Sequence, residues 1–351
     1  MTTLRGVLGR LLLLLFSLVV SLAISEAFFS LLLSHPAWLA RMPANVLSHV
    51  RAYYLHHDRT LVQAMPECAR YDPGLFYTLK PGACRFQARE FDVEVRVNSA
   101  GLRDDEESLE APEVIVAGDS FAMGWGVQQD EAFPQAIAKA SGLRVLNAGV
   151  PSYGTVREMR LLDRLDTSRL RWLLIQYDDN DEPENQAYFE AQNQLVIHPE
   201  GTYARDVRRD ASRHGYWFGK TSFEILHGIL EPEPLPAAAE VTPKEEARYF
   251  ANALIHATRR DLSSVRIIVF ELQPYRVSQS AFETALMREI SLAGHKPYIR
   301  GMQLLDLHGV VGPEDYYVLD DHLRAQGHAK LARLLMAEMR EEGGPDAPAA
   351  P

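Results

Sequence analysis

The central part of the chain alternates short, continuously apolar runs with helical stretches, and this alternation restricts the fold more than any other feature. The runs VIVAG, RVLNAG, LRWLLIQY and RIIVFEL occupy residues 114–118, 144–149, 170–177 and 266–272. A strand that is apolar on both faces must be covered on both faces, and helices between successive strands supply that cover. We therefore expect an α/β fold with three layers, α/β/α, around a mainly parallel sheet.

The segments between and after these runs carry helical patterns. We expect helices over residues 133–141, 155–165, 243–260, 278–292 and 325–341. Ahead of the first run, FDVEVRVNSAGLRD predicts a half-buried strand because its apolar residues alternate with polar ones. These apolar residues are Phe91, Val93, Val95 and Val97.

A second apolar stretch, residues 11–33, lies near the N-terminus. As a helix it would extend roughly 34 Å, at about 1.5 Å per residue, which is long enough to span a bilayer. Arg5 and Arg10 precede the stretch and only Arg41 follows closely, so the positive-inside rule leaves the N-terminus in the cytoplasm. We expect one transmembrane helix with the rest of the chain outside the cytoplasm, periplasmic or extracellular.

A cleaved signal peptide is the competing interpretation of this stretch. Ala23, Ile24 and Ser25 resemble a cleavage site, and Glu26 favours cleavage because a carboxylate in hydrocarbon is costly. Against cleavage, the apolar run resumes over residues 27–33, which a mature N-terminus would expose to water. The domain would be secreted in one case and anchored in the other, and both cases export it.

Charge and cysteine content exclude several classes of function. The net charge is −11 and there is no run of Lys or Arg, which argues against a nucleic-acid partner. Phosphate-cradling glycine loops are absent from the sequence, so no nucleotide or redox cofactor is expected. Cys68 and Cys84 lack the spacing of a zinc site; a disulfide fits an oxidising compartment, and two reduced thiols are the alternative.

Four short polar blocks follow one another in the chain. Gly118-Asp119-Ser120 comes directly after an apolar run, so Ser120 would occupy the carboxyl end of a parallel strand, where ligands bind in open α/β sheets. Alone, this serine could simply cap a helix. The other blocks are Asn147-Ala148-Gly149, Asn180-Asp181 and Asp320-Asp321-His322.

With these blocks in this order, the chain resembles the GDSL/SGNH hydrolases over roughly residues 72–340. The flanking sequences NSAGLRD and NAGVPSYGT are similar to membrane-anchored bacterial members. The resemblance implies an SGNH, flavodoxin-like fold and a serine hydrolase that acts on ester bonds. Ser120 would be the nucleophile and His322 the general base. The oxyanion hole would comprise the backbone N–H groups of Ser120 and Gly149 and the side-chain amide of Asn180.

The sequence departs from the family pattern at two positions. Asp178 stands where the third block usually has glycine, which leaves the geometry of that loop open. The family commonly places the aspartate that orients the histidine three residues before it, but residue 319 is leucine. We expect Asp320 in this role, since side chains two residues apart in an extended or turn segment point to the same side, and Asp321 is the alternative.

The sequence suggests four divisions of the chain. Residues 1–34 would be the anchor or signal peptide, 35–110 a connector and β-rich lead-in, and 111–342 the SGNH hydrolase domain with an insertion at about 183–241. Residues 343–351, rich in Pro, Ala and Gly, would be a disordered tail. The aromatic cluster around Trp217 in the insertion could form a lid, rest on a membrane or belong to the core.

The expected reaction is cleavage of a carboxylic ester through an acyl-enzyme on Ser120. An O-acyltransferase that modifies a cell-envelope polysaccharide with the same residues is the alternative, and an inactive binding module is a third interpretation. The acidic residues 178–182 could bind a hard cation, but their spacing is not that of an EF-hand, and no metal is expected. The substrate could be a lipid, an acylated glycan or a small ester. The sequence indicates no oligomeric state.

Overall fold

The structure is a computed structural model that describes residues 2–230, 241–273, 281–292 and 296–343. It divides into two compact units. The larger comprises the described residues of Leu61–Arg208, Ala238–Tyr317 and Asp321–Pro351, and the smaller those of Met1–Thr60, Arg209–Ala237 and Val318–Asp320.

These units divide the chain differently from the boundaries expected from the sequence. Residues 35–60 group with the N-terminal helix, whereas the β-rich lead-in belongs to the larger unit. The expected insertion, 183–241, is divided after Arg208, and residues 209–230 group with the N-terminal helix. Side chains far apart in sequence share one apolar cluster there, which no local pattern reveals. The expected tail beyond residue 343 lies outside the described residues.

Five parallel strands form the sheet of the larger unit, in the order β6-β5-β7-β8-β9. The strands are β5 Val114–Ala117, β6 Val145–Asn147, β7 Trp172–Tyr177, β8 Arg266–Glu271 and β9 Gln303–Leu305. The four apolar runs form β5 to β8, so the predicted parallel sheet is confirmed. Three residues are too short a run to predict β9 from the sequence.

The chain reverses its direction of travel across the sheet at β5. From β5 it moves outward to β6 and then returns to the other side of β5 to form β7. Such a switch point leaves a crevice at the carboxyl ends of the strands, which is where ligands bind in open α/β sheets. Three of the four polar blocks lie at or within a few residues of the carboxyl ends of β5, β6 and β7.

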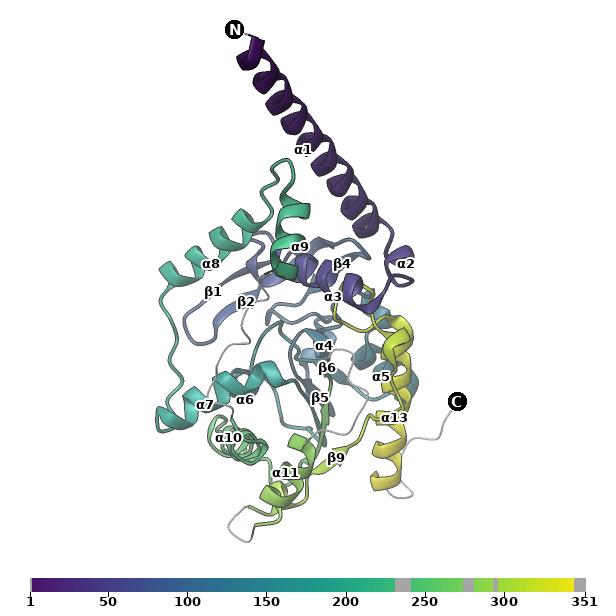
Figure 1. Ribbon diagram of the computed structural model, residues 1–351. Helices are drawn as coiled ribbons and strands as arrows, with labels where there is room; N and C mark the ends of the chain where they lie inside the picture. Colours follow the sequence, from purple (N-terminus) through teal and green to yellow (C-terminus); the bar gives the residue numbers. More distant parts are fainter. Residues whose placement is uncertain (1, 231–240, 274–280, 293–295, 344–351) are drawn as a thin grey trace. The chain divides into compact units, whose positions relative to one another are not determined.

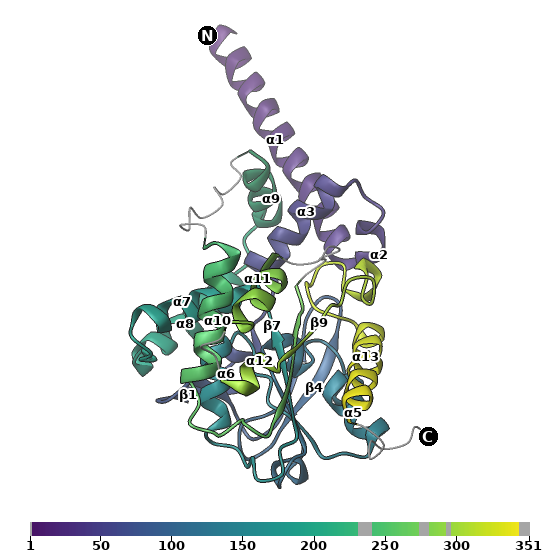
Figure 2. The same ribbon diagram turned by 90° about the horizontal axis from the view of Figure 1, so that it is seen from below.

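Alternate residues of each strand pack on opposite faces of the sheet. Ile115 and Leu173 belong to one apolar cluster, whereas Val114 and Trp172 belong to another. The first cluster includes side chains of α6 Thr155–Leu162, α10 Pro243–His256 and α11 Ala281–Ile290; the second includes side chains of α5 Phe133–Ser141 and α13 Ala325–Gly343. Figure 2 shows these two helical layers on either side of the strands. The predicted three-layer fold is confirmed.

Two antiparallel strand pairs precede the sheet. They are β1 Ala69–Asp72 with β2 Phe76–Leu79, and β3 Gly82–Gln87 with β4 Asp92–Val97. Along β4 every second residue is buried, as the alternating pattern predicts. A disulfide joins Cys68 to Cys84, with the two Cα atoms 5.6 Å apart. It ties the start of the first pair to the second.

The smaller unit is helical. It contains α1 Thr2–Ser34, α2 Pro36–Leu39, α3 Ala44–Tyr53, a π-helical turn Tyr54–Asp58 and α9 Lys220–Leu230 (Figure 1). Its apolar cluster includes Leu32, Leu33, Val50, Tyr54, Ile225 and Leu319. Within α1, Gly6–Ser34 is long and apolar enough to cross a membrane.

The remaining elements are short or peripheral. They are α4 Ser120–Met123, α7 Glu182–Glu190, α8 Glu200–Arg213, α12 Pro297–Arg300 and the 3-10 turns Val62–Ala64, Glu107–Leu109, Gln129–Glu131, Asp179–Asp181 and Pro313–Asp315.

Candidate active site

Ser120 lies in a sharp turn between β5 and the short helix α4. Gly118 has φ +152°, and a Cβ on it would lie 2.5 Å from Gln176 Oε1 and 2.7 Å from Ala122 Cβ, so only glycine fits. The Asp119 carboxylate caps α4 by accepting the Phe121 N–H at 2.9 Å. The backbone N–H of Ser120 is in the first turn of the helix and has no acceptor among the described residues.

His322 faces this serine. Its Nε2 lies 2.7 Å from Ser120 Oγ, which is hydrogen-bonding distance, and its side chain is buried. The His322 carbonyl accepts the Tyr317 N–H at 3.0 Å. The imidazole stacks on the Trp125 ring, with centroids 4.8 Å apart and planes 16° apart. The ring is therefore held by packing as well as by hydrogen bonds.

The structure brings both candidate aspartates close to His322, since ligand atoms of Asp320, Asp321 and His322 lie within 4.8 Å of one another. Asp321 Oδ1 lies 3.0 Å from His322 Nδ1, whereas Asp320 Oδ2 accepts the Tyr54 hydroxyl at 2.9 Å in the smaller unit. The chain bends over residues 318–322, so the expected direction of side chains two residues apart does not decide which aspartate makes the short contact with the ring. If Asp321 accepts a hydrogen bond from Nδ1–H, the lone pair of Nε2 faces Ser120 Oγ and can take its proton.

The amide of Asn180 is held between two carboxylates. Its Nδ2 donates to Asp119 Oδ2 and to Asp178 Oδ2, each at 3.0 Å. Asp178, which replaces the glycine usual in the family, thus directly contacts the predicted oxyanion donor. One of these hydrogen bonds would have to be exchanged before Asn180 could donate to an oxyanion.

The predicted donor Gly149 already has an acceptor. Its N–H donates to Asn147 Oδ1 at 3.0 Å, and a Cβ at Gly149 would lie 2.3 Å from the Met123 nitrogen. Gly149 therefore allows close packing of the loop against α4 and presents no open N–H. Ser152, three residues further along, has φ +56°, is exposed, and its N–H has no acceptor in the described chain.

Buried carboxyl groups surround this region of the larger unit. Burial, with Asn180 and Phe121 acting in the opposite direction, leaves the pKa of Asp119 raised. Burial and the neighbouring Asp119 raise the pKa of Asp178 well above its usual range, and burial with Glu158 does the same for Asp181. Raised pKa values favour neutral carboxyl groups here.

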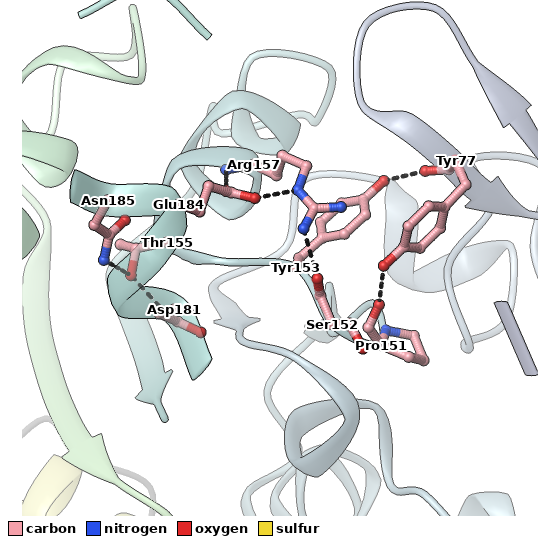
Figure 3. A network of polar contacts seen from close by, with 9 residues as sticks. All are labelled: Tyr77, Pro151, Ser152, Tyr153, Thr155, Arg157, Asp181, Glu184 and Asn185. Carbon is pink, nitrogen blue, oxygen red and sulfur yellow. Dashed lines mark hydrogen bonds and ion pairs between the residues drawn. The ribbon is translucent and has the colours of Figure 1, made fainter. Parts of the chain in front are cut away.

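The loop after Gly149 is braced by a polar network, drawn in Figure 3. The Tyr77 hydroxyl donates to the Pro151 carbonyl at 2.5 Å, and Arg157 donates to the Ser152 carbonyl at 2.6 Å. Arg157 also pairs with Glu184 at 2.5 Å. Although burial alone would lower the pKa of Arg157, Tyr77 and Glu184 raise it, so this guanidinium stays charged.

Beside this network lies a cavity of about 370 Å³. Its lining includes Phe76, Arg157, Glu184, Tyr188, Leu195 and His198, but not Ser120 or His322. The cavity is thus distinct from the space at the serine. The candidate active site is identified by the contacts of His322 with Ser120 and Asp321. The cavity does not include these residues.

The comparisons with known proteins show similarity to solved structures only. No family model and no curated protein sequence matches the chain. A GDSL-like lipase from Bacteroides ovatus is 12% identical, with a TM-score of 0.36, over 68% of this chain and 55% of that one. The chain thus spans about half the length of that lipase.

Two further solved structures are similar in the same way. A lipolytic protein of the G-D-S-L family from Desulfitobacterium hafniense is 14% identical, with a TM-score of 0.32, over 63% of this chain and 98% of that one. A salicylyl-acyltransferase from a tetracycline biosynthetic pathway is 14% identical, with a TM-score of 0.38, over 68% of this chain and 56% of that one.

Proposed function

We propose that this chain is an extracytoplasmic serine acylhydrolase that cleaves a carboxylic ester through an acyl-enzyme on Ser120. One observation carries the proposal: Ser120 Oγ lies 2.7 Å from His322 Nε2, while His322 Nδ1 lies 3.0 Å from Asp321 Oδ1. Both distances fall in the range of about 2.6–3.2 Å expected of a nucleophile, a base and the group that orients the base. The order of the four sequence blocks supports the same assignment.

In the first half of the reaction, Ser120 Oγ attacks the ester carbonyl and its proton passes to His322 Nε2. The imidazolium that forms is stabilised by the Asp321 carboxylate at Nδ1 and by the indole face of Trp125. The tetrahedral intermediate then collapses, the alcohol leaves with the proton from Nε2, and the acyl group remains on Oγ. In the second half, water attacks the acyl-enzyme with His322 again as the base, and the carboxylic acid is released.

The negative charge on the carbonyl oxygen needs preorganised donors. The open N–H of Ser120 supplies one, and we propose Asn180 as a second, after it exchanges a carboxylate for the oxyanion. Gly149 is not proposed as a donor in this arrangement, since Asn147 accepts its N–H.

The test is labelling and turnover by the full-length chain in detergent. We expect a fluorophosphonate probe to modify Ser120 and p-nitrophenyl esters of short and long chain length to be hydrolysed. Ser120→Ala should abolish both, whereas Ser168→Ala, at an exposed serine outside the site, should abolish neither. Labelling and turnover that survive Ser120→Ala would refute the proposal.

An acyl acceptor distinguishes the second candidate reaction. If a polysaccharide hydroxyl attacks the acyl-enzyme in place of water, the same residues catalyse O-acyl transfer. We therefore add an acetylated donor and an unacetylated glycan to the assay. Ser120-dependent acylation of the glycan, faster than release of free acid, would identify an O-acyltransferase. Release of acid alone would identify an esterase.

We also propose that residues 11–33 hold the domain at a membrane. The helix Gly6–Ser34 is long and apolar enough to span one, and the side chains of residues 6–21 are exposed all round the helix. Exposure of leucines in water would be costly, and a bilayer removes that cost. The cationic residues ahead of the stretch support an N-terminus inside the cytoplasm.

A further inference from the structure

Glu26 lies within the apolar helix α1, yet its side chain is buried and both of its carboxylate oxygens accept hydrogen bonds. Oε1 accepts the Thr221 N–H at 3.3 Å, and Oε2 accepts the Ser222 N–H at 2.9 Å and the Ser222 hydroxyl at 3.0 Å. These N–H groups belong to the first turn of α9, where the unpaired donors of a helix favour an anion. Glu26 therefore caps α9 from a position almost 200 residues earlier in the chain.

The two helices also pack against each other closely. Gly219, at φ +89°, precedes α9, and a Cβ on it would lie 2.9 Å from Leu22 Cδ2. One helical turn further along α1 comes Glu26, and beyond it Leu33 shares an apolar cluster with Ile225 of α9. The contact face of α1 thus follows the spacing of helical turns over residues 22–33. Residues 6–21 of α1 are exposed.

The opposite face of α9 is apolar and exposed. Phe223 is 53% exposed, Leu226 44% and Leu230 79%, and their spacing of three and four residues places them on one side of the helix. Trp217 and Phe218, just before the helix, are 49% and 55% exposed. A contiguous apolar surface of this kind marks an interaction site.

Charged groups of α9 lie away from this surface. The Lys220 side chain is buried and donates to the Arg213 carbonyl, and Glu224 lies 3.8 Å from His57 Nε2. His227, on the apolar side, stacks on the Phe223 ring. The helix therefore combines an apolar face with charges directed elsewhere, which is the pattern of a helix that lies in a membrane interface.

The contact with α1 sets the depth of α9. Glu26 precedes Leu33, the last apolar residue of the stretch, by seven residues, or about 10 Å along the helix axis. Interfacial helices bury their apolar face to a depth of about 5–10 Å, and Trp is enriched at that level. A bilayer crossed by α1 would therefore meet the exposed face of α9 at the depth that such helices occupy.

We propose that residues 216–230 are a second membrane contact, in which α9 lies in the leaflet near the Ser34 end of α1 with its apolar face on the acyl chains. This rests on the proposed anchoring by residues 11–33. A single helix leaves an anchored unit free to rotate about the helix axis. A second contact, tied to the first by Glu26, restricts that rotation.

The test uses the full-length chain in vesicles of phosphatidylethanolamine and phosphatidylglycerol. Both native cysteines are in the disulfide, so one introduced cysteine can carry an environment-sensitive fluorophore. Labels are placed at Leu226→Cys on α9, at Leu18→Cys on α1 and at Val196→Cys, an apolar residue of the larger unit that is 68% exposed. Fluorescence loss is measured with nitroxide lipids, which quench from the bilayer, and with iodide, which quenches from water.

We expect lipid quenching and protection from iodide at Leu18 and Leu226, and the reverse at Val196. The nitroxide near the headgroup should quench the Leu226 label more strongly than one near the middle of the acyl chain. If Leu226 behaves like Val196 while Leu18 is quenched by lipid, the inference is overturned and the anchor stands. If Leu18 also behaves like Val196, the anchor itself fails. Protection of Leu226 from both quenchers would indicate a protein contact and would likewise overturn the inference.

Glu26 supplies a second, independent variant. Glu26→Leu removes the cap of α9 but makes α1 more apolar, so insertion of α1 is retained. We expect the Leu226 label in this variant to lose lipid quenching and gain iodide quenching, with no change at Leu18. Glu26→Gln, which keeps a hydrogen-bond acceptor, should give an intermediate result. No change at Leu226 in Glu26→Leu would show that the cap does not position α9.

Discussion

At the scale of single residues, the orientation and tautomer of the His322 imidazole decide whether the proposed mechanism is possible. His322 can serve Ser120 only if its Nδ1 carries the proton, and the neighbouring carboxylate that accepts a hydrogen bond from this N–H is that of Asp321. Asp320, the adjacent residue in the chain, is instead bonded to Tyr54. Two aspartates in succession thus have different partners, and their roles are separable by experiment.

Asp321→Asn should reduce kcat by about 10²- to 10⁴-fold with little change in KM. The neutral amide neither stabilises the imidazolium nor favours the required tautomer. Asp320→Asn is the matched control, since its side-chain oxygen can still accept the Tyr54 hydroxyl, and kcat should change little. Steady-state kinetics on a p-nitrophenyl ester measure both. An equal loss in the two variants would contradict the assignment of Asp321.

Asn180→Ala should lower kcat by about 10²- to 10³-fold, the usual cost of removing one oxyanion donor. Asp178→Gly restores the residue that the family pattern has at this position and leaves one Asn180 N–H without its carboxylate acceptor. We expect kcat to rise in that variant, because the amide no longer has to exchange a hydrogen bond. Unchanged kcat in Asn180→Ala would remove Asn180 from the proposed oxyanion hole.

At the scale of elements, the ends of β5, β6 and β7 bring three of the polar blocks to one edge of the sheet. Each strand is too short to present a site alone, and the order β6-β5-β7 makes the three loops neighbours. The last block is delivered by the loop before α13. That helix is held by Leu331 and Leu335 in the apolar cluster on the sheet, and by His328, which accepts the Phe133 N–H at 3.3 Å.

Burial of His328 makes the stability of this packing depend on pH. Burial lowers the pKa of His328 to about 3, against 6.5 when exposed, so between these values the unfolded chain binds more protons than the folded one. The free energy of unfolding should therefore fall as pH decreases below about 6.5, by up to about 1.4 kcal/mol per pH unit from this group.

The measurement is urea unfolding from neutral to acid pH, with His328→Gln as the comparison. Glutamine can still accept the Phe133 N–H but does not titrate. Burial raises the pKa of Asp104 to about 6, an effect of opposite sign that both proteins share. The difference between the two proteins thus isolates His328, and a difference independent of pH would refute the prediction.

At the scale of the whole molecule, one chain combines a parallel-sheet unit that carries the proposed chemistry with a helical unit that includes the apolar N-terminus. The helical unit recruits residues 209–230 and 318–320 from far along the chain. Glu26, which as a sequence feature favours cleavage, is buried against α9 and bonded there. The proposed anchor is therefore also a packed part of this unit.

We expect the mature protein to keep residues 1–25. Cleavage before Glu26 would remove Leu22 from the contact with Gly219 and place a charged amine beside the cap of α9. Intact-mass measurement of protein purified from membranes should give the full chain, and alkaline carbonate should not extract it. A mature N-terminus at Glu26 would contradict retention of the anchor.

The sequence alone was enough to predict the layers of the fold, and it indicated Ser120 as the proposed proton donor and His322 as the proposed acceptor. Buried parallel strands must be apolar along their whole length, so residues 114–118 and 170–177 are recognisable locally, and the four blocks single out Ser120 and His322. The same locality explains why β9 and the helices between residues 35 and 60 were not predicted. A three-residue strand and a short helix gain most of their stability from the elements that they contact.

The tertiary structure decided the contacts on which the roles depend. The path of the chain at residues 320–322 sets which of two adjacent aspartates contacts the imidazole. The N–H of Gly149 is occupied by Asn147, and the side-chain amide of Asn180 is occupied by Asp119 and Asp178. The pairing of Glu26 with α9 joins positions almost 200 residues apart. Local propensity and periodicity describe neighbours within a few residues, whereas hydrogen-bond partners and buried neighbours are fixed by the packing of the whole chain.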